Sequence, residues 1–264
     1  MTRFTADDDL RSAEFVAADL TGARFHFTEL EGAVFSQSYL PRAVLRGVDL
    51  TDADVDGAIT GLKVNGIEVL PLIEAELNRR YPGRQWARSR VVAQQRESFE
   101  AALRTWSATL DRVAAMPAGT VDQQVDGEWS TAQTLRHLVF AVDGWVRHGI
   151  QGLDGAFSPI GLPFSEYDDE AGALGVDIAA APSFQEVQAA FADRVAQVRA
   201  LYDSLTQEQF EAPARRLPPW EPESRSLPVW RCLGVIANEL WEHHRFADRD
   251  LDELERRSDA RQAR

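Results

Sequence analysis

Apolar residues recur at every fifth position through the first part of the chain. The central residue of each unit is Leu, Phe or Val at ten successive positions: Leu10, Phe15, Leu20, Phe25, Leu30, Phe35, Leu40, Leu45, Leu50 and Val55. The residue two positions earlier is mostly Ala, Ser or Thr. Neither the helical period of 3.6 nor the strand period of 2 produces a repeat of five. A coil that turns a corner every five residues does, with the large and the small apolar residue inward.

Units such as AADLT, GARFH and GAVFS resemble the pentapeptide-repeat family. The resemblance covers residues 8–60 and implies a short right-handed quadrilateral β-solenoid with four pentapeptides per coil. A stack of about two and a half coils is the length of a folded cap, because coils of this kind are stabilised by their neighbours.

Residues 61–84 are predicted to form a hairpin and a short helix that link the repeats to the rest of the chain and cap them. Asn65-Gly66 lies between two short apolar segments, and both central positions of such a turn require positive φ. Pro71 opens a helix that is expected to end near Arg80. The hairpin would cover the strand edges of the last coil.

Beyond residue 85 the apolar spacing becomes helical, with Phe99, Leu103 and Trp106 three and four residues apart. Helices are predicted over 91–116, 130–149, 183–205 and from 228 past 254, two of them opened by capping boxes. These helices predict an all-α four-helix bundle over residues 85–258, followed by a frayed tail at 259–264. The connection over 151–182 is long enough to be a crossover or a functional segment, and its aromatic residues are candidates to hold the apolar part of a substrate.

The last helix contains the candidate metal ligands. His243 takes an inward position in an otherwise apolar stripe, and Glu239 lies one turn earlier, at a spacing that lets both side chains reach one ligand. His244 and Asp248 form a second pair with the same spacing on the adjacent face. A single inward histidine is more often a hydrogen-bonded core residue than a ligand.

His137 lies on the second helix, away from that helix's main apolar stripe and on a face with Ala141, Gly144 and His148. Periodicity alone therefore indicates a groove or surface residue at this position. From the residues alone, a role for His137 in metal binding stays open.

The sequence Trp129-Ser130 at a helix start, a histidine eight residues after the tryptophan, and a last helix reading ANELWEHHRFADRDLDEL resemble the DinB/YfiT-like family. The resemblance spans residues 90–256 and implies a metal-binding four-helix bundle with up-down-down-up topology. The family site is usually three histidines. His137 matches the first and His243 one of the last pair, while the remaining position falls on Glu239, or on Phe246 or Ala247 if the pair is counted forwards.

A His-His-Glu set suits zinc or nickel. The family includes transferases and isomerases that use mycothiol or bacillithiol, so the resemblance implies a metal-dependent enzyme that transfers a low-molecular-weight thiol to a small electrophile. No catalytic or thiol-binding residue is assigned. Cys232 is a poor nucleophile candidate, because a lone Cys in an apolar helix is usually packing.

The alternative is a non-catalytic interaction or scaffold protein, in which the solenoid binds a partner and the bundle site is degenerate. Acidic pentapeptide solenoids can imitate duplex DNA, but that requires a long charged rod, whereas this repeat segment is short and interrupted by Arg24, Arg42 and Arg46. A homodimer or a protein partner bound through the solenoid stays open.

The charge, the cysteine count and the length of the apolar runs exclude or disfavour several classes of function. The formal net charge is −14, which disfavours binding to nucleic acid and to anionic membrane surfaces. The single cysteine excludes an intrachain disulfide and any multi-cysteine metal site. No apolar run has the roughly 20 residues that a membrane span needs, and the N-terminus lacks the features of a signal peptide. We therefore expect a cytoplasmic protein.

Overall fold

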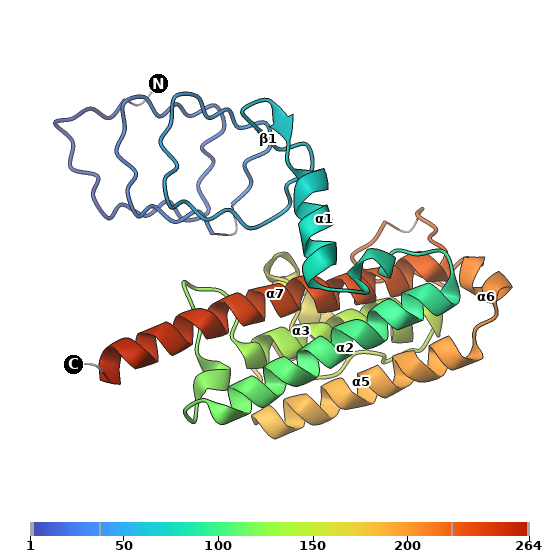
Figure 1. Cartoon of the computed structure of the whole chain (residues 1–264). Coiled ribbons are helices and arrows are strands. Elements are labelled where there is room, and N and C mark those ends of the chain that lie inside the picture. Colours follow the sequence, from blue (N-terminus) through green and yellow to red (C-terminus); the bar gives the residue numbers. More distant parts are fainter. Residues whose placement is uncertain (1–2, 37, 223, 263–264) are drawn as a thin grey trace. The chain divides into compact units, whose positions relative to one another are not determined.

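Corners recur every five residues in the N-terminal part of the computed structural model, which describes residues 3–36, 38–222 and 224–262. The backbone takes positive φ at Ser12, Ala17, Gly22, Phe27, Gly32, Arg42, Gly47, Asp52 and Gly57. Four of these corners, at Ser12, Gly22, Gly32 and Arg42, are closed by an amide that donates to the carbonyl three residues earlier, as Ala13 does to Leu10 at 3.1 Å. Figure 1 shows the resulting coils in blue, so the period of five appears in the backbone.

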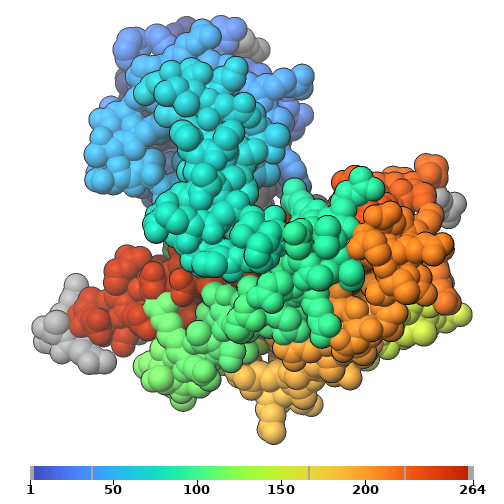
Figure 2. Space-filling model, turned by 45° about the vertical axis from the view of Figure 1, so that its right-hand side comes forward, coloured from blue at the N-terminus to red at the C-terminus, as the bar shows by residue number. Residues whose placement is uncertain are grey.

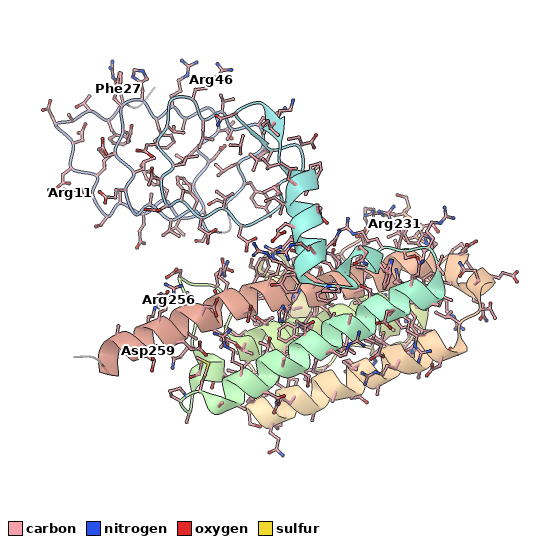
Figure 3. All side chains as sticks on the ribbon, viewed as in Figure 1. Arg11, Phe27, Arg46, Arg231, Arg256 and Asp259 are labelled. Atoms are coloured by element: carbon pink, nitrogen blue, oxygen red, sulfur yellow. The ribbon has the colours of Figure 1, made fainter. Side chains whose placement is uncertain are left out.

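The expected β-solenoid is not formed by the described part of residues 8–60. That part contains no strand, and its backbone hydrogen bonds close local turns without joining one coil to the next. The ten central apolar residues, predicted to lie inward, are between 43% and 69% exposed. Coils that are not hydrogen-bonded to each other leave room for solvent between them, which explains the exposure. Figure 3 labels Arg11, Phe27 and Arg46 on the outside of these coils.

The predicted hairpin and short helix are confirmed. Strands β1 (Lys63–Val64) and β2 (Ile67–Glu68) pair antiparallel around Asn65 and Gly66, whose φ angles are 50° and 84°. Helix α1 (Leu70–Arg80) follows, with a proline in its first turn. The two positive φ angles are those that the turn requires.

The chain forms two compact units that divide between Leu50 and Thr51, and each is described by itself. After α1, the second unit consists of helices of very different length. In order they are η1 (Arg84–Trp86), α2 (Val92–Ala115), η2 (Thr120–Asp122), α3 (Thr131–Val142), η3 (Asp143–Ile150), η4 (Ser165–Tyr167), α4 (Asp168–Ala171), η5 (Gly172–Leu174), α5 (Phe184–Ser204), α6 (Gln207–Glu211) and α7 (Val229–Gln262). The long helices lie within a few residues of the predicted ones, and both predicted capping boxes are present.

Side-chain contacts fix the directions of the long helices. The Trp106 indole N–H of α2 donates to the Leu240 carbonyl of α7 at 2.9 Å, and Arg112, further along α2, pairs with Asp248, further along α7. Helices α2 and α7 therefore run the same way. Helix α5 runs opposite to α2, because Tyr202 bonds to Gln95 and an earlier residue of α5 contacts a later residue of α2. Figure 1 shows α2, α3, α5 and α7 side by side.

The core of this unit lies between these helices. Most of its largest buried side chains come from α2, α3 and α7, and Phe210 of α6 joins them; those of the three long helices are at most 2% exposed: Phe99, Trp106, Leu135, Leu138, Phe140, Leu233, Ile236 and Leu240. Helix α3 continues into η3, a π-helix, where the fully buried Asp143 pairs with Arg194 of α5 at 2.6 Å. This ion pair joins the two helices in the interior.

The segment between η3 and α5 packs onto α3 through aromatic rings. Phe140 of α3 contacts Phe157 and Tyr167 of this segment, and also Trp220 from the loop between α6 and α7, with ring centroids 5.0–6.5 Å apart. Phe164 contacts Tyr167 and Trp220 as well. The aromatic residues of the crossover thus pack against one another and against α3.

Helix α7 extends beyond the other helices of its unit, as Figure 2 shows in red. Leu251 and Leu254 pack against Val113, and the following turns project into solvent, where Figure 3 labels Arg256 and Asp259. The expected fraying is wrong for residues 259–262, which are helical, and residues 263–264 lie outside the described part. Among the described helices, none is both long and apolar enough to span a membrane.

Candidate metal centre

Helix α7 places Glu239 and His243 on one face, a single turn apart. The Nε2 atom of His243 lies 3.0 Å from Oε2 of Glu239. Their side chains are 14% and 28% exposed, so both are largely removed from water. The predicted pairing of these two residues is present, and it leaves the carboxylate at the edge of the helical core.

Helix α3 brings His137 to the same place. Ser130 and Gln133 form the capping box that fixes the start of α3, and His137 lies two turns further along. Its Nδ1 atom is 3.1 Å from the carbonyl oxygen of Leu162, in the crossover. A carbonyl can only accept, so Nδ1 carries the proton and Nε2 of the neutral ring is left with a free lone pair.

The three side chains converge. Nε2 of His137 lies 3.5 Å from Oε2 of Glu239, and the imidazole centroids of His137 and His243 are 4.8 Å apart. One candidate donor atom from each of the three residues lies within 4.8 Å of the others, close enough for small side-chain movements to bring all three onto one ion. Two imidazole nitrogens and a carboxylate oxygen fit a divalent ion of the zinc or nickel type.

The alternative pair, His244 and Asp248, lies elsewhere. Nε2 of His244 is 2.9 Å from Oγ1 of Thr109, and the ring, 3% exposed, packs between Tyr81 and Trp106. Asp248 pairs with Arg112. Successive residues on a helix point about 100° apart, so His244 faces α2 while His243 faces α3. Whether this pair could take the place of His243 and Glu239 was left open by the sequence; in the structure neither side chain is placed beside His137.

Burial and neighbouring charges shift the pKa values of these side chains in opposite directions. Burial by itself would raise the pKa of Glu239, but the hydrogen bonds and the positive charge that the two imidazoles supply when they are protonated hold that pKa well below its usual range. Burial lowers the pKa of His137, partly opposed by Glu239. The carboxylate is thus ionised and His137 neutral near pH 7, which is the protonation state that a metal ion requires.

Aromatic rings surround the three side chains. Trp129 lies over both imidazoles, with centroids 4.7 Å from His137 and 5.9 Å from His243. Phe246 contacts His243 edge-on at 5.8 Å. On the inner side, Glu239 borders a cavity of only about 10 Å³ among apolar residues such as Leu138 and Ile236. A cavity of that size holds about one water, so the interior behind Glu239 is closed.

Sequence reasoning missed the group that orients His137. The Leu162 carbonyl belongs to the backbone of the crossover, and a carbonyl leaves no trace in residue type. The crossover also explains why His137, expected in a groove or on the surface, is only 7% exposed. Trp129 was identified as part of a motif, whereas its contact with both imidazoles depends on the way α3 and α7 pack.

Comparison with known proteins identifies the family. The DinB superfamily pattern matches residues 101–247, more than half of the chain, and pentapeptide repeats match residues 9–37 and 28–59 in eight copies. The chain therefore belongs to the DinB superfamily and carries pentapeptide repeats before that domain. Domains of this superfamily are typically metal-binding.

Among solved structures, the chain is similar to a crystal structure of a protein from Streptococcus pneumoniae. The two are 18% identical, the match covers 60% of this chain and 90% of the other, and the TM-score is 0.41. A search of curated proteins found no match.

Proposed function

We propose that the helical unit binds a divalent metal, zinc or nickel, through His137, Glu239 and His243, and that the metal serves thiol chemistry on a small electrophile. The observation that carries this proposal is the convergence of the three donors from two helices. A surface cluster of chance origin would consist of exposed side chains, whereas the least buried of these is 28% exposed. We also take α2, α3 with η3, α5 and α7 as the up-down-down-up bundle of this family.

A divalent ion with three protein ligands would keep a position open and favour the thiolate form of a bound thiol. Other residues of the chain orient these three side chains. Leu162 fixes the tautomer of His137, and Trp129 covers both imidazoles. Because Trp129 excludes water from that side, charge interactions between the three donors are strengthened.

The thiol must come from a cosubstrate. Cys232 is fully buried, and burial raises the pKa of its thiol to about 12, so it is neither accessible nor ionised near pH 7. We propose mycothiol or bacillithiol in this role. In the reaction, the cosubstrate thiol loses its proton to solvent, its sulfur forms a bond to the electrophilic carbon, and the leaving group departs with the electron pair of the bond that breaks.

The test is to assay the full chain, purified without a histidine tag and loaded with zinc or nickel, for consumption of mycothiol, bacillithiol or glutathione with a panel of small electrophiles. We expect turnover that is lost in His243→Ala and retained in Glu242→Gln, a change on the same helix. If the metal-loaded chain accelerates none of these reactions, the catalytic part of the proposal is wrong.

A non-catalytic role is the second candidate, because the repeats present exposed apolar residues. Phe15, Phe25 and Phe35 are each more than half exposed, and exposed apolar residues that recur along a surface often mark binding to another protein. In that case the repeats would bind a protein partner or a second copy of this chain. Removal of residues 1–50 would then abolish the interaction and leave metal binding unchanged.

A further inference from the structure

Residues 158–162 of the crossover, here called the strap, lie directly on α3 beside His137. The Leu162 amide donates to the carbonyl of Arg136 at 3.2 Å, and the Leu162 carbonyl accepts from Nδ1 of His137 at 3.1 Å. A Cβ on Gly161 would approach Cβ of Phe140 to 3.3 Å, so a larger residue would fit there only if the strap or Phe140 shifted slightly.

The side chain of Arg136 also binds the strap, two residues before Leu162. Its Nε donates to the Ile160 carbonyl at 2.8 Å, so two consecutive residues of α3 bond to carbonyls two residues apart in the strap. The Arg136 side chain is nearly buried, with the residue only 7% exposed, and its Nη2 atom has no hydrogen-bond partner among the described residues.

A buried guanidinium at this position is expected to lower the stability of the fold compared with an apolar side chain. Burial lowers the pKa of Arg136, opposed by the charge of Asp177, and within the described part of the chain no carboxylate forms an ion pair with it. A buried charge without a bonded counter-charge is unfavourable, and an apolar side chain would fill the same space more cheaply. What the guanidinium does is fix a strap carbonyl two residues from the one that orients His137.

We propose that Arg136 is a positioning residue for the metal centre: it holds the strap so that the Leu162 carbonyl keeps the proton of His137 on Nδ1 and Nε2 faces Glu239 and His243. This inference rests on the proposed metal binding. Without Arg136, the strap would keep the bond from the Ser158 amide to Asp143 and its backbone bonds, but it would lose the donor that fixes the Ile160 carbonyl, and the ring would exchange between tautomers. A His137 with its proton on Nε2 must lose that proton before it can bind an ion.

The test compares the full-length wild type with Arg136→Met, Arg136→Lys and Arg147→Met. Arg147 is the matched control, since it lies on the same helical segment, has an unpartnered buried Nε, and bonds only weakly, at 3.4 Å, to Asp143. Two quantities are measured: the dissociation constant for Zn²⁺ in competition with a chromophoric chelator, and the tautomer of His137 by ¹H–¹⁵N NMR of the metal-free protein at pH 8.

We expect Arg136→Met to weaken Zn²⁺ binding about tenfold, the lower end of what loss of an orienting contact costs a metal site. His137 should then show both tautomers. Arg136→Lys, which keeps a donor for the Ile160 carbonyl, should restore most of the affinity, and Arg147→Met should bind like the wild type. Wild-type affinity and a pure Nδ1–H tautomer in Arg136→Met would overturn the inference, as would equal losses in Arg136→Met and Arg147→Met.

The experiment distinguishes failure of the proposed metal binding from failure of the proposed role of Arg136. If the wild type binds no Zn²⁺, the proposed function fails, and the tautomer of His137 in the metal-free variants decides the role of Arg136 by itself. If Arg136→Met does not fold, the folded Arg136→Lys and Gly161→Ala, whose added Cβ would lie 3.3 Å from Cβ of Phe140, take its place, and wild-type affinity and tautomer in both would overturn the inference.

Discussion

Replacement of Glu239 by glutamine tests the donor set with the smallest change in shape. The carboxylate accepts from Nε2 of His243 at 3.0 Å and lies 3.5 Å from Nε2 of His137. The amide keeps an acceptor oxygen for His243, so the metal-free protein should change in stability by only about 1 kcal/mol. The amide cannot supply the negative charge that balances a divalent ion.

The expected loss of affinity can be converted into a smaller metal-induced rise in the melting temperature. Loss of an orienting contact costs a metal site about 10–100-fold, so loss of a ligand should cost at least about 100-fold. At a metal concentration about 100 times the wild-type dissociation constant, binding stabilises the wild type by about 2.7 kcal/mol and Glu239→Gln by about 0.4 kcal/mol. For a unit of this size those values correspond to shifts of about 5–11 °C and 1–2 °C.

The assay is thermal unfolding followed by circular dichroism at 222 nm, with and without Zn²⁺. This signal reports the helical unit, because the described residues before β1 contain no helix. The matched control is Glu242→Gln, on the same helix and with a side chain 27% exposed against 28% for Glu239. Glu242 bonds to Arg84 and Arg245, and its variant should keep the full shift. Equal metal-induced shifts in Glu239→Gln and the wild type would refute the reasoning.

Three further results are expected. Asp143→Asn should destabilise the helical unit by about 3–5 kcal/mol in urea unfolding, because it breaks the buried ion pair and leaves Arg194 with only the exposed Asp193 as a counter-charge; a loss below about 1 kcal/mol would show that the pair is dispensable. Cys232 should resist iodoacetamide at pH 8 in the native protein and react fully in guanidinium, because burial raises the pKa of its thiol to about 12; rapid native alkylation, followed by mass spectrometry, would contradict this. In chelator, the melting temperature should fall from pH 7.5 to pH 5.5, because burial lowers the pKa values of His137 and His244 below 6.5 and the unfolded chain then binds more protons than the folded one; a flat profile would contradict that assignment.

Local signals in the sequence predicted local structure well. Asn65-Gly66 gave its hairpin, and the capping boxes at Ser130 and Ser183 gave the starts of two helices, because each depends on residues within a few positions. The i, i+4 pair of Glu239 and His243 was predictable for the same reason. The coils of the repeat kept their period but lacked the predicted strands, since pairing between coils depends on contacts that the five-residue pattern does not specify.

The environment of His137 could not be predicted in this way. On the helix surface it lies off the apolar stripe of α3, and it is buried because the strap covers that face. The strap is an irregular segment without apolar periodicity, so nothing in its sequence indicates where it lies. The choice between His243 and His244 likewise depended on which neighbour each face of α7 meets, and only resemblance to a family pointed to His137.

The central claim is that His137, Glu239 and His243 bind one metal ion together. The most direct measurement is elemental analysis combined with X-ray absorption spectroscopy of the tag-free, metal-replete full chain. The account predicts one divalent ion per chain, with two imidazole nitrogens and a carboxylate oxygen at about 2.0–2.2 Å, and loss of the ion in His243→Ala. An ion content far below one per chain, or a spectrum without imidazole ligands, would contradict it.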